Sequence, residues 1–462
     1  MPVWSKNLVS KSVIKSGINY KMKIFLIDKV IKKKLIGLEK SAFYKFITVG
    51  KSDGFVTTSI VEEIIEAVKK DGDKALISYC NKFDKTSFSK AGDFLLPKKE
   101  FDKAEKELNQ EVRDALKLAY SRIKSYHQKQ LPQDFYFIDD IGVELGNSWR
   151  TIESVGVYVP GGTASYPSSV LMSVVPAIVA GVKEISICVP SSAGKINPAV
   201  IFAAKICGVK KIYKIGGAQA IAALAYGTKT VKKVDKIVGP GNSYVACAKK
   251  ILFGEVGIDM IAGPTDVTII ADESSNPRWI AADALSQLEH GIDSKAFIIT
   301  DSEGFAKKVL VAIEELKMNL PRLDIIEKSL KNSAIFVIKN LDEAVHIVNV
   351  IAPEHLEIVT KNPKKFLPNI KNAGAIFLGK YTPEAIGDYI AGPSHTLPTS
   401  SSARFSSGLS VFDFLKRVSI ISCDRNSFLK LSNTVSILAN CEGLCGHDAS
   451  ISIRTSDQKY KK

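Results

Sequence analysis

Two successive runs of alternating strand and helix patterns constrain the fold of this chain more than any other feature. In the first run, short β-branched segments alternate with longer segments of helical periodicity, and the expected strands are 155–159, 184–189, 211–215 and 236–238. The alternation restarts with DVTIIAD at 266–272, and the later strands of this second run are 295–300, 333–338 and 375–378. Because strands joined through a crossover helix pair in parallel, the sequence predicts two α/β units, each with a parallel sheet.

The segments outside these runs predict helices and small appended parts. Apolar residues at helical spacing cover 57–76 and 103–130, ahead of the first run. Beyond Pro398 the chain becomes Ser-rich (TSSSARFSSG), which favours an exposed connection to a last mixed segment over 411–438.

The N-terminus shows no targeting pattern. No acidic residue precedes Asp28, yet an uninterrupted apolar stretch with a cleavage site is missing, and the basic residues are Lys rather than the Arg of a mitochondrial presequence. We interpret residues 1–51 as a basic extension, or as a chain whose translation starts at Met22. The longest apolar stretch, 166–182, is interrupted by Pro176 and is shorter than the roughly 20 residues that a bilayer-spanning helix requires, so no membrane span is expected.

Charge and cysteine usage bear on partners and compartment. The formal net charge of +15 comes mostly from lysines spread over the whole chain, without an Arg-rich or aromatic-interleaved face suited to reading bases. We therefore expect solvated surface lysines and no nucleic-acid partner. The seven cysteines form no CxxC pair, which favours reduced thiols and a cytoplasmic protein.

Gly-rich junctions follow three expected strands of the first run, at 160–162, 216–217 and 239–242. Glycine lets backbone amides approach a phosphate, and the N-terminus of the following helix adds a favourable dipole. No GxGxxG motif opens the unit, and glycine after a strand is also ordinary turn chemistry. These loops alone leave nucleotide binding and simple turns equally open.

A second group of residues suits a metal ion. Gln287 and His290 lie one helical turn apart in SQLEH, Asp388 lies in a GDY loop, and His447 ends CEGLCGH. Imidazole, carboxylate and amide ligands without a thiolate are typical of a catalytic zinc site. A lone QxxH pair is more often an ordinary surface feature, and the sequence patterns do not say whether the four side chains converge.

The segment APEHLE places an acid and an imidazole side by side after a helix-ending proline. His355 can accept and return protons near neutrality, and Glu354 beside it can activate water. An isolated Pro-Glu-His is, however, more often a solvated turn.

Taken in order, these segments resemble the histidinol dehydrogenase family. The segments that carry the resemblance are VGVYVPGGTASYPSSVLM, GGAQAIAALAYGT, VGPGN, DMIAGPTD, ALSQLEHG, APEHLE, GDYIAGPSHTLPT and CEGLCGH. The match as a whole runs from about Ser52 to His447. The resemblance implies two incomplete Rossmann-like domains with parallel sheets, small N- and C-terminal segments, and a homodimer with shared active sites. We divide the chain into the extension 1–51, a discontinuous α/β domain of 52–154 and 266–398, an NAD-associated α/β domain of 155–265, and a dimer-contact segment of 399–462.

The resemblance also implies the site residues and their roles. It implies that one Zn²⁺ per subunit is bound by Gln287, His290, Asp388 and His447, the last from the neighbouring subunit. His355 would be the base for the alcohol proton, and Glu354 would activate the water that attacks the aldehyde. The implied substrate contacts are Thr265, where many family members have Ser, and His395 and Glu442, in addition to the zinc ligands and His355; the implied NAD contacts are Tyr158, Gln219 and Asn242.

The implied reaction is the NAD-dependent, four-electron oxidation of L-histidinol to L-histidine through histidinaldehyde, the last steps of histidine biosynthesis. It needs two hydride transfers and two successive NAD molecules, while the aldehyde stays bound. The alternatives are a zinc and NAD alcohol dehydrogenase for another small polar alcohol, a basic nucleic-acid-binding protein, and a zinc hydrolase, which would need the HExxH helix that this sequence lacks.

Overall fold

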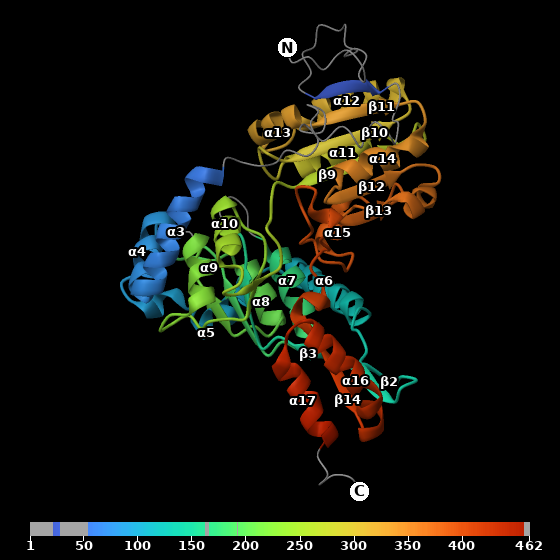
Figure 1. The fold of residues 1–462 in the computed structure, drawn as a ribbon. Helices are drawn as coiled ribbons and strands as arrows, with labels where there is room; N and C mark the ends of the chain where they lie inside the picture. The colour runs from blue at the N-terminus through green and yellow to red at the C-terminus, as the bar shows by residue number, and fades with distance from the viewer. Residues whose placement is uncertain (1–21, 28–53, 162–165, 192, 457–462) are drawn as a thin grey trace.

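The computed structural model describes residues 22–27, 54–161, 166–191 and 193–456, and these residues form two parallel sheets and one antiparallel sheet (Figure 1). Gly162 and most of the N-terminal extension lie outside the described residues. The α/β class with two parallel sheets, expected from the alternating patterns, is confirmed. No helix in the described part of the chain is long and apolar enough to cross a membrane.

The first parallel sheet has five strands in the order β6-β5-β4-β7-β8. Its strands are β4 (Ser154–Tyr158), β5 (Glu184–Cys188), β6 (Lys211–Tyr213), β7 (Lys236–Val238) and β8 (Gly257–Ile258), and the helices between or after them are α7 (Pro167–Val179), α8 (Pro198–Ile206), α9 (Gly217–Tyr226) and α10 (Ser243–Leu252). Asn197 and Asn242 cap the N-termini of α8 and α10 by accepting hydrogen bonds from backbone amides. All four predicted strands of the first run are present, and only the two-residue β8 was not predicted.

The helices that precede this sheet in the sequence pack against it. They are α3 (Gly54–Asp71), α4 (Asp73–Phe83), α5 (Lys98–Glu107) and α6 (Gln110–Gln128), with a 3₁₀ turn η2 (Ala91–Phe94). Helix α3 contacts α9 and α10, α5 contacts α8, and α6 contacts α7. Leu76 and Ile123 are buried in the two hydrophobic cores of the five-stranded unit. This packing differs from the expected division, which joined 52–154 to 266–398, because the apolar faces of these helices cover the five-stranded sheet.

The second parallel sheet has six strands in the order β1-β11-β10-β9-β12-β13. Its strands are β1 (Lys23–Ile27), β9 (Asp266–Ala271), β10 (Lys295–Thr300), β11 (Ala334–Ile338), β12 (His355–Val359) and β13 (Ala375–Leu378), and its helices are α11 (Pro277–Leu288), α12 (Glu303–Lys317), α13 (Leu323–Ser329), α14 (Ala344–Ile351) and α15 (Glu384–Tyr389), with 3₁₀ turns η3 (Leu330–Asn332), η4 (Leu341–Glu343) and η5 (Pro363–Asn369).

Two strands of this sheet correct the sequence interpretation. Strand β12 begins at His355, where a turn was expected, and all five of its residues are buried. Strand β1 lies within the presumed extension and pairs with β11 at the sheet edge, and Met22 just before it is buried. Residues 22–27 therefore belong to the folded unit, because their alternating apolar side chains complete its core.

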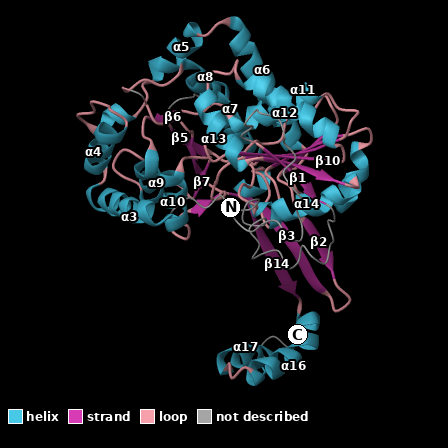
Figure 2. Ribbon diagram, turned by 90° about the horizontal axis from the view of Figure 1, so that it is seen from above, coloured by secondary structure: helices cyan, strands magenta, loops and turns pink. Residues whose placement is uncertain are grey.

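The antiparallel sheet and the C-terminal helices project from the two units. The sheet consists of β2 (Phe135–Ile138), β3 (Val143–Thr151) and β14 (Leu415–Cys423), and it is followed by α16 (Arg425–Cys441) and α17 (Cys445–Ser456). Turns η6 (Ser402–Arg404) and η7 (Val411–Phe414) lead into it. In Figure 2, α16 and α17 lie beyond the end of this sheet, away from the parallel sheets.

Candidate active site

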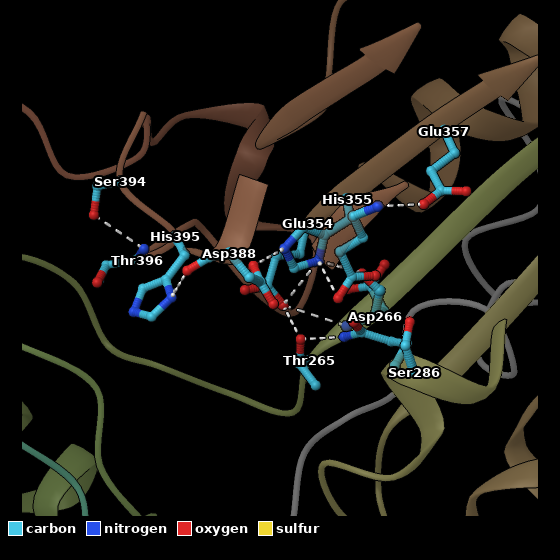
Figure 3. Close-up of polar contacts among 12 residues, drawn as sticks. Thr265, Asp266, Ser286, Glu354, His355, Glu357, Asp388, Ser394, His395 and Thr396 are labelled. Atoms are coloured by element: carbon cyan, nitrogen blue, oxygen red, sulfur yellow. Dashed lines mark hydrogen bonds and ion pairs between the residues drawn. The ribbon is translucent and has the colours of Figure 1, made fainter. Parts of the chain in front are cut away.

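The amino ends of β9 and β12 bring the acid-imidazole pair together with a second pair of residues. The strands are parallel neighbours, and His355 is in register with Val267, so Glu354-His355 lies beside Thr265-Asp266 (Figure 3). Helix α14 ends at Ile351, and the left-handed backbone of the next residue, Ala352 (φ 50°), turns the chain sharply toward β12. The pair is thus held at the end of a buried strand rather than in a solvated turn.

Hydrogen bonds fix both side chains of this pair. The Thr265 hydroxyl donates to the Glu354 carboxylate, and the Asp266 backbone amide donates to the same Oε2 at 3.3 Å. His355 Nδ1 lies 3.2 Å from the Asp266 carbonyl oxygen. Because a carbonyl oxygen only accepts, Nδ1 carries the proton in this contact. In the neutral ring, Nε2 is then the free base, and it lies 3.7 Å from Asp388 Oδ1.

Three side chains beside this pair could hold a metal ion. Ligand atoms of His290, Glu384 and Asp388 all lie within 4.8 Å of one another. Glu384 and Asp388 share one face of α15 because they are four residues apart, and His290 follows the end of α11. Nitrogen and oxygen ligands without sulfur suit Zn²⁺.

Gln287 joins these three side chains to the Glu354-His355 pair. It is fully buried and contacts the Thr265 hydroxyl. With its amide nitrogen turned toward Glu384, it donates to Oε2 at 2.8 Å, while its oxygen accepts from the Asp266 amide at 3.1 Å. Gln287 is thus hydrogen-bonded to Glu384, whose carboxylate lies beside His290 and Asp388.

Glu384 is a site residue that the sequence interpretation missed. It is 2% exposed, and its backbone amide donates to Glu357 Oε1 at 2.7 Å. The available signal was the spacing of four residues between Glu384 and Asp388, which places two acids on one face of a short helix.

The site concentrates buried acidic groups around one imidazole. Burial raises the pKa of Glu354 to about 7, of Glu384 to about 8 and of Asp266 to about 6. Burial by itself would lower the pKa of His355, but the carboxylates of Glu384 and Glu354 outweigh it and raise this pKa well above its usual value. Asp266 Oδ2 and His355 Nε2 are buried without a hydrogen-bond partner. These buried acids and unpartnered ligand atoms fit a divalent cation, whose positive charge would offset the cost of burying the carboxylates.

His395 connects this cluster to the five-stranded unit. Its Nδ1 lies 3.0 Å from the Asp388 carbonyl oxygen, and its Nε2 lies 3.3 Å from the Ser169 hydroxyl at the start of α7. The candidate site therefore lies where the amino edge of the six-stranded sheet meets the first turn of α7.

The three residues implied for NAD lie where strands of the five-stranded sheet end. Tyr158 ends β4, and its hydroxyl accepts from the Gly217 amide at 3.1 Å. Gln219 is buried in α9 with an unpartnered amide nitrogen. Asn242 is exposed, and because its oxygen caps α10, its amide nitrogen remains available as a donor.

The glycines of these loops leave no room for side chains. A Cβ at Gly161 or Gly216 would lie 2.6 or 2.5 Å from a side-chain carbon of Pro190, and at Gly239 it would collide with the Tyr158 carbonyl oxygen. The bare backbone at this carboxyl edge fits a dinucleotide, which binds at the carboxyl ends of strands in open α/β sheets.

Two of the implied site residues are not brought to the site within this chain. Glu442 follows the last residue of α16, and His447 lies in α17; both are exposed. Helix α17 packs mainly on α16, and both helices lie far from α15 in Figure 1.

Comparisons with known proteins agree with the geometry. A sequence profile described as histidinol dehydrogenase matches residues 50–455. The histidinol dehydrogenase of Hydrogenovibrio crunogenus is 48% identical over 399 residues, which cover 86% of this chain and 92% of that protein. Histidinol dehydrogenase 1 of a Nostoc species is 49% identical over 403 residues, with 86% and 92% covered.

A solved structure extends the likeness to the fold. The crystal structure of histidinol dehydrogenase from Elizabethkingia anophelis superposes with a TM-score of 0.88 at 35% identity, and the match covers 95% of this chain and 99% of that one. The profile match over most of the chain, the close relatives and this common fold agree: the chain belongs to the histidinol dehydrogenase family.

Proposed function

We propose that this chain oxidises L-histidinol to L-histidine with NAD, at a zinc site formed by Gln287, His290 and Asp388. The observation that carries the proposal is the convergence of the Glu354-His355 pair with these three side chains and Glu384, which come from three separate segments of the chain. The names of the relatives indicate the substrate, and the acid-imidazole pair and candidate metal ligands of the site suit its oxidation.

His355 acts as the base of the first half-reaction. With a bound cation offsetting the carboxylates that otherwise raise its pKa, the His355 ring is neutral. Its Nδ1 proton is held by the Asp266 carbonyl, so Nε2 takes the proton of the alcohol while a hydride leaves the carbon for NAD. A zinc ion, when bound, holds and orients the substrate by its nitrogen atoms. The buried position of His355 keeps bulk water from competing for the proton.

Glu354 acts in the second half-reaction. Its carboxylate, held by the Thr265 hydroxyl and the Asp266 amide, takes a proton from the water that adds to the aldehyde. The aldehyde oxygen takes the proton that His355 accepted in the first half-reaction, which makes His355 a base again. The resulting hydrate has a tetrahedral carbon that can lose a second hydride to a second NAD molecule, and His355 again takes the hydroxyl proton.

The active site is completed by a second copy of the chain. His447 of the partner subunit supplies the fourth protein ligand, and Glu442 of the partner subunit contacts the polar end of the substrate, because neither residue reaches the site of its own chain. The exposed apolar residues of the projecting part, such as Ile421 and Ile437, are suited to burial against a partner.

Counting NADH per molecule of histidinol tests the function. Two NADH per substrate, lost on chelation and restored by Zn²⁺, is the expected result. One NADH would indicate a simple alcohol dehydrogenase, and none with zinc present would contradict the proposal.

A further inference from the structure

A buried ion pair lies behind one of the loops at the carboxyl edge of the five-stranded sheet. Lys249, in the last turn of α10, is 2% exposed in its side chain and contacts Asp259 Oδ1, and the Asp259 side chain is fully buried. Asp259 directly follows β8 and begins the connection 259–265 that leads to Thr265 in the catalytic site.

Both partners of this ion pair also form hydrogen bonds with the backbone around them. Lys249 donates to the Gly239 carbonyl at 3.0 Å, and the Gly239 amide donates to Asp259 Oδ2 at 2.7 Å. The Met260 amide donates to Asp259 Oδ1 at 2.6 Å. The pair therefore holds both polar backbone groups of Gly239.

Gly239 is a residue whose conformation needs such support. Its φ of 109° is open only to glycine, and its Cα approaches the Tyr158 carbonyl so closely that no Cβ fits. It starts the turn 239–242, which ends at Asn242, the exposed cap of α10. Because Lys249 lies in α10, the same ion pair ties the turn, the helix and the connection 259–265 together.

We propose that the Lys249–Asp259 ion pair positions the Gly239–Asn242 turn for the nicotinamide dinucleotide, so that its loss weakens NAD binding more than the chemical steps. The inference rests on the proposed function, because it takes NAD as the ligand of this edge. A buried ion pair is weak evidence for a stabilising role, since apolar residues of similar size are often at least as stable. Here Lys249 and Asp259 instead hold Gly239, which lies beside Tyr158 and Asn242, two of the residues implied to contact NAD.

The test compares two lysine substitutions of the same kind. Lys249→Met removes the charge but keeps an unbranched apolar stem. Lys317→Met is the matched control: Lys317, at the end of α12 in the six-stranded unit, is 6% exposed in its side chain and pairs with Glu314 at 2.5 Å, but it contacts neither loop. NAD affinity is measured by equilibrium titration, and KM for NAD, KM for histidinol, kcat, zinc content and thermal midpoint are measured for each protein.

We expect both substitutions to lower the thermal midpoint, but only Lys249→Met to raise Kd and KM for NAD, by about tenfold, the effect of losing one charge-assisted hydrogen bond. Its kcat at saturating NAD and its zinc content should stay within about threefold of wild type, a tolerance of under 1 kcal/mol. Equal NAD affinity in both variants would overturn the inference.

A more conservative substitution and a measurement on wild-type protein test the inference if Lys249→Met does not fold. Asp259→Glu keeps the charge but moves the carboxylate away from the Gly239 amide, and it should also weaken NAD binding. If neither variant folds, amide exchange of wild-type protein decides: protection of 239–242 should rise on adding NAD, and unchanged protection overturns the inference. A wild-type chain that binds NAD but does not oxidise histidinol would contradict the proposed function and leave this inference standing, whereas one that does not bind NAD would overturn the inference.

Discussion

Replacing Glu354 by Gln should separate the two half-reactions. Gln has nearly the same shape, and its amide oxygen can still accept from the Thr265 hydroxyl and from the Asp266 amide, which lies 3.3 Å from Oε2. The substitution therefore removes proton acceptance while the packing remains. Because the Glu354 side chain is only 8% exposed, no bulk water replaces it as a base.

The expected loss follows from the role of the residue. A positioned general base contributes about 10²- to 10⁴-fold, which corresponds to about 3 to 5 kcal/mol of barrier. We expect a loss of this size when histidinaldehyde is supplied as substrate. Oxidation of the alcohol to the aldehyde should stay within roughly fivefold of wild type, because His355 performs that proton transfer.

Single-turnover NADH formation from each substrate measures the two steps separately. Zinc content and thermal midpoint serve as controls and should match wild type. Equal loss with both substrates, at unchanged zinc content, would refute the assignment of Glu354 to water activation and would indicate a general role in binding or positioning.

Four further outcomes follow from the site. His355→Asn should slow both half-reactions at least about 100-fold, since one imidazole serves both proton transfers; a normal rate with either substrate would contradict this role. Glu384→Gln should lower zinc retained after dialysis, measured by elemental analysis, and unchanged retention would exclude Glu384 from the metal site. Mixing His447→Asn and His355→Asn subunits should restore part of the activity through hybrid dimers, and no recovery after verified subunit exchange would contradict shared sites. The thermal midpoint of zinc-free protein should fall as the pH rises from 5 to 8, because buried Glu354 and Asp266 have raised pKa values, about 7 and 6, and bind protons that the unfolded chain has released. Zinc should stabilise most at the upper end of this range, and a midpoint that rises with pH would contradict the account.

The amino-acid sequence by itself determined the helices and strands whose apolar residues recur with a clear periodicity. All eight predicted strands of the two runs are present with bounds shifted by at most two residues, because β-branched alternation and helical spacing are local signals that tertiary contacts seldom reverse here. The motifs of the sequence made Glu354, His355 and the metal-ligand residues candidates, and the family resemblance implied their roles.

The tertiary structure decided which segments pack against one another, and local sequence patterns do not contain that information. Strand β12 was missed because His355 and Glu357 interrupt its apolar pattern, and only burial against β9 and β13 makes that segment a strand. Glu384 became a site residue only when α15 placed it beside His290. The helices of 54–128 pack on the five-stranded unit because their apolar faces fit its cores. An amphipathic pattern predicts that a helix buries one face, but it does not specify which sheet that face contacts. Convergence in space depends on the packing of distant segments, and no local pattern encodes it.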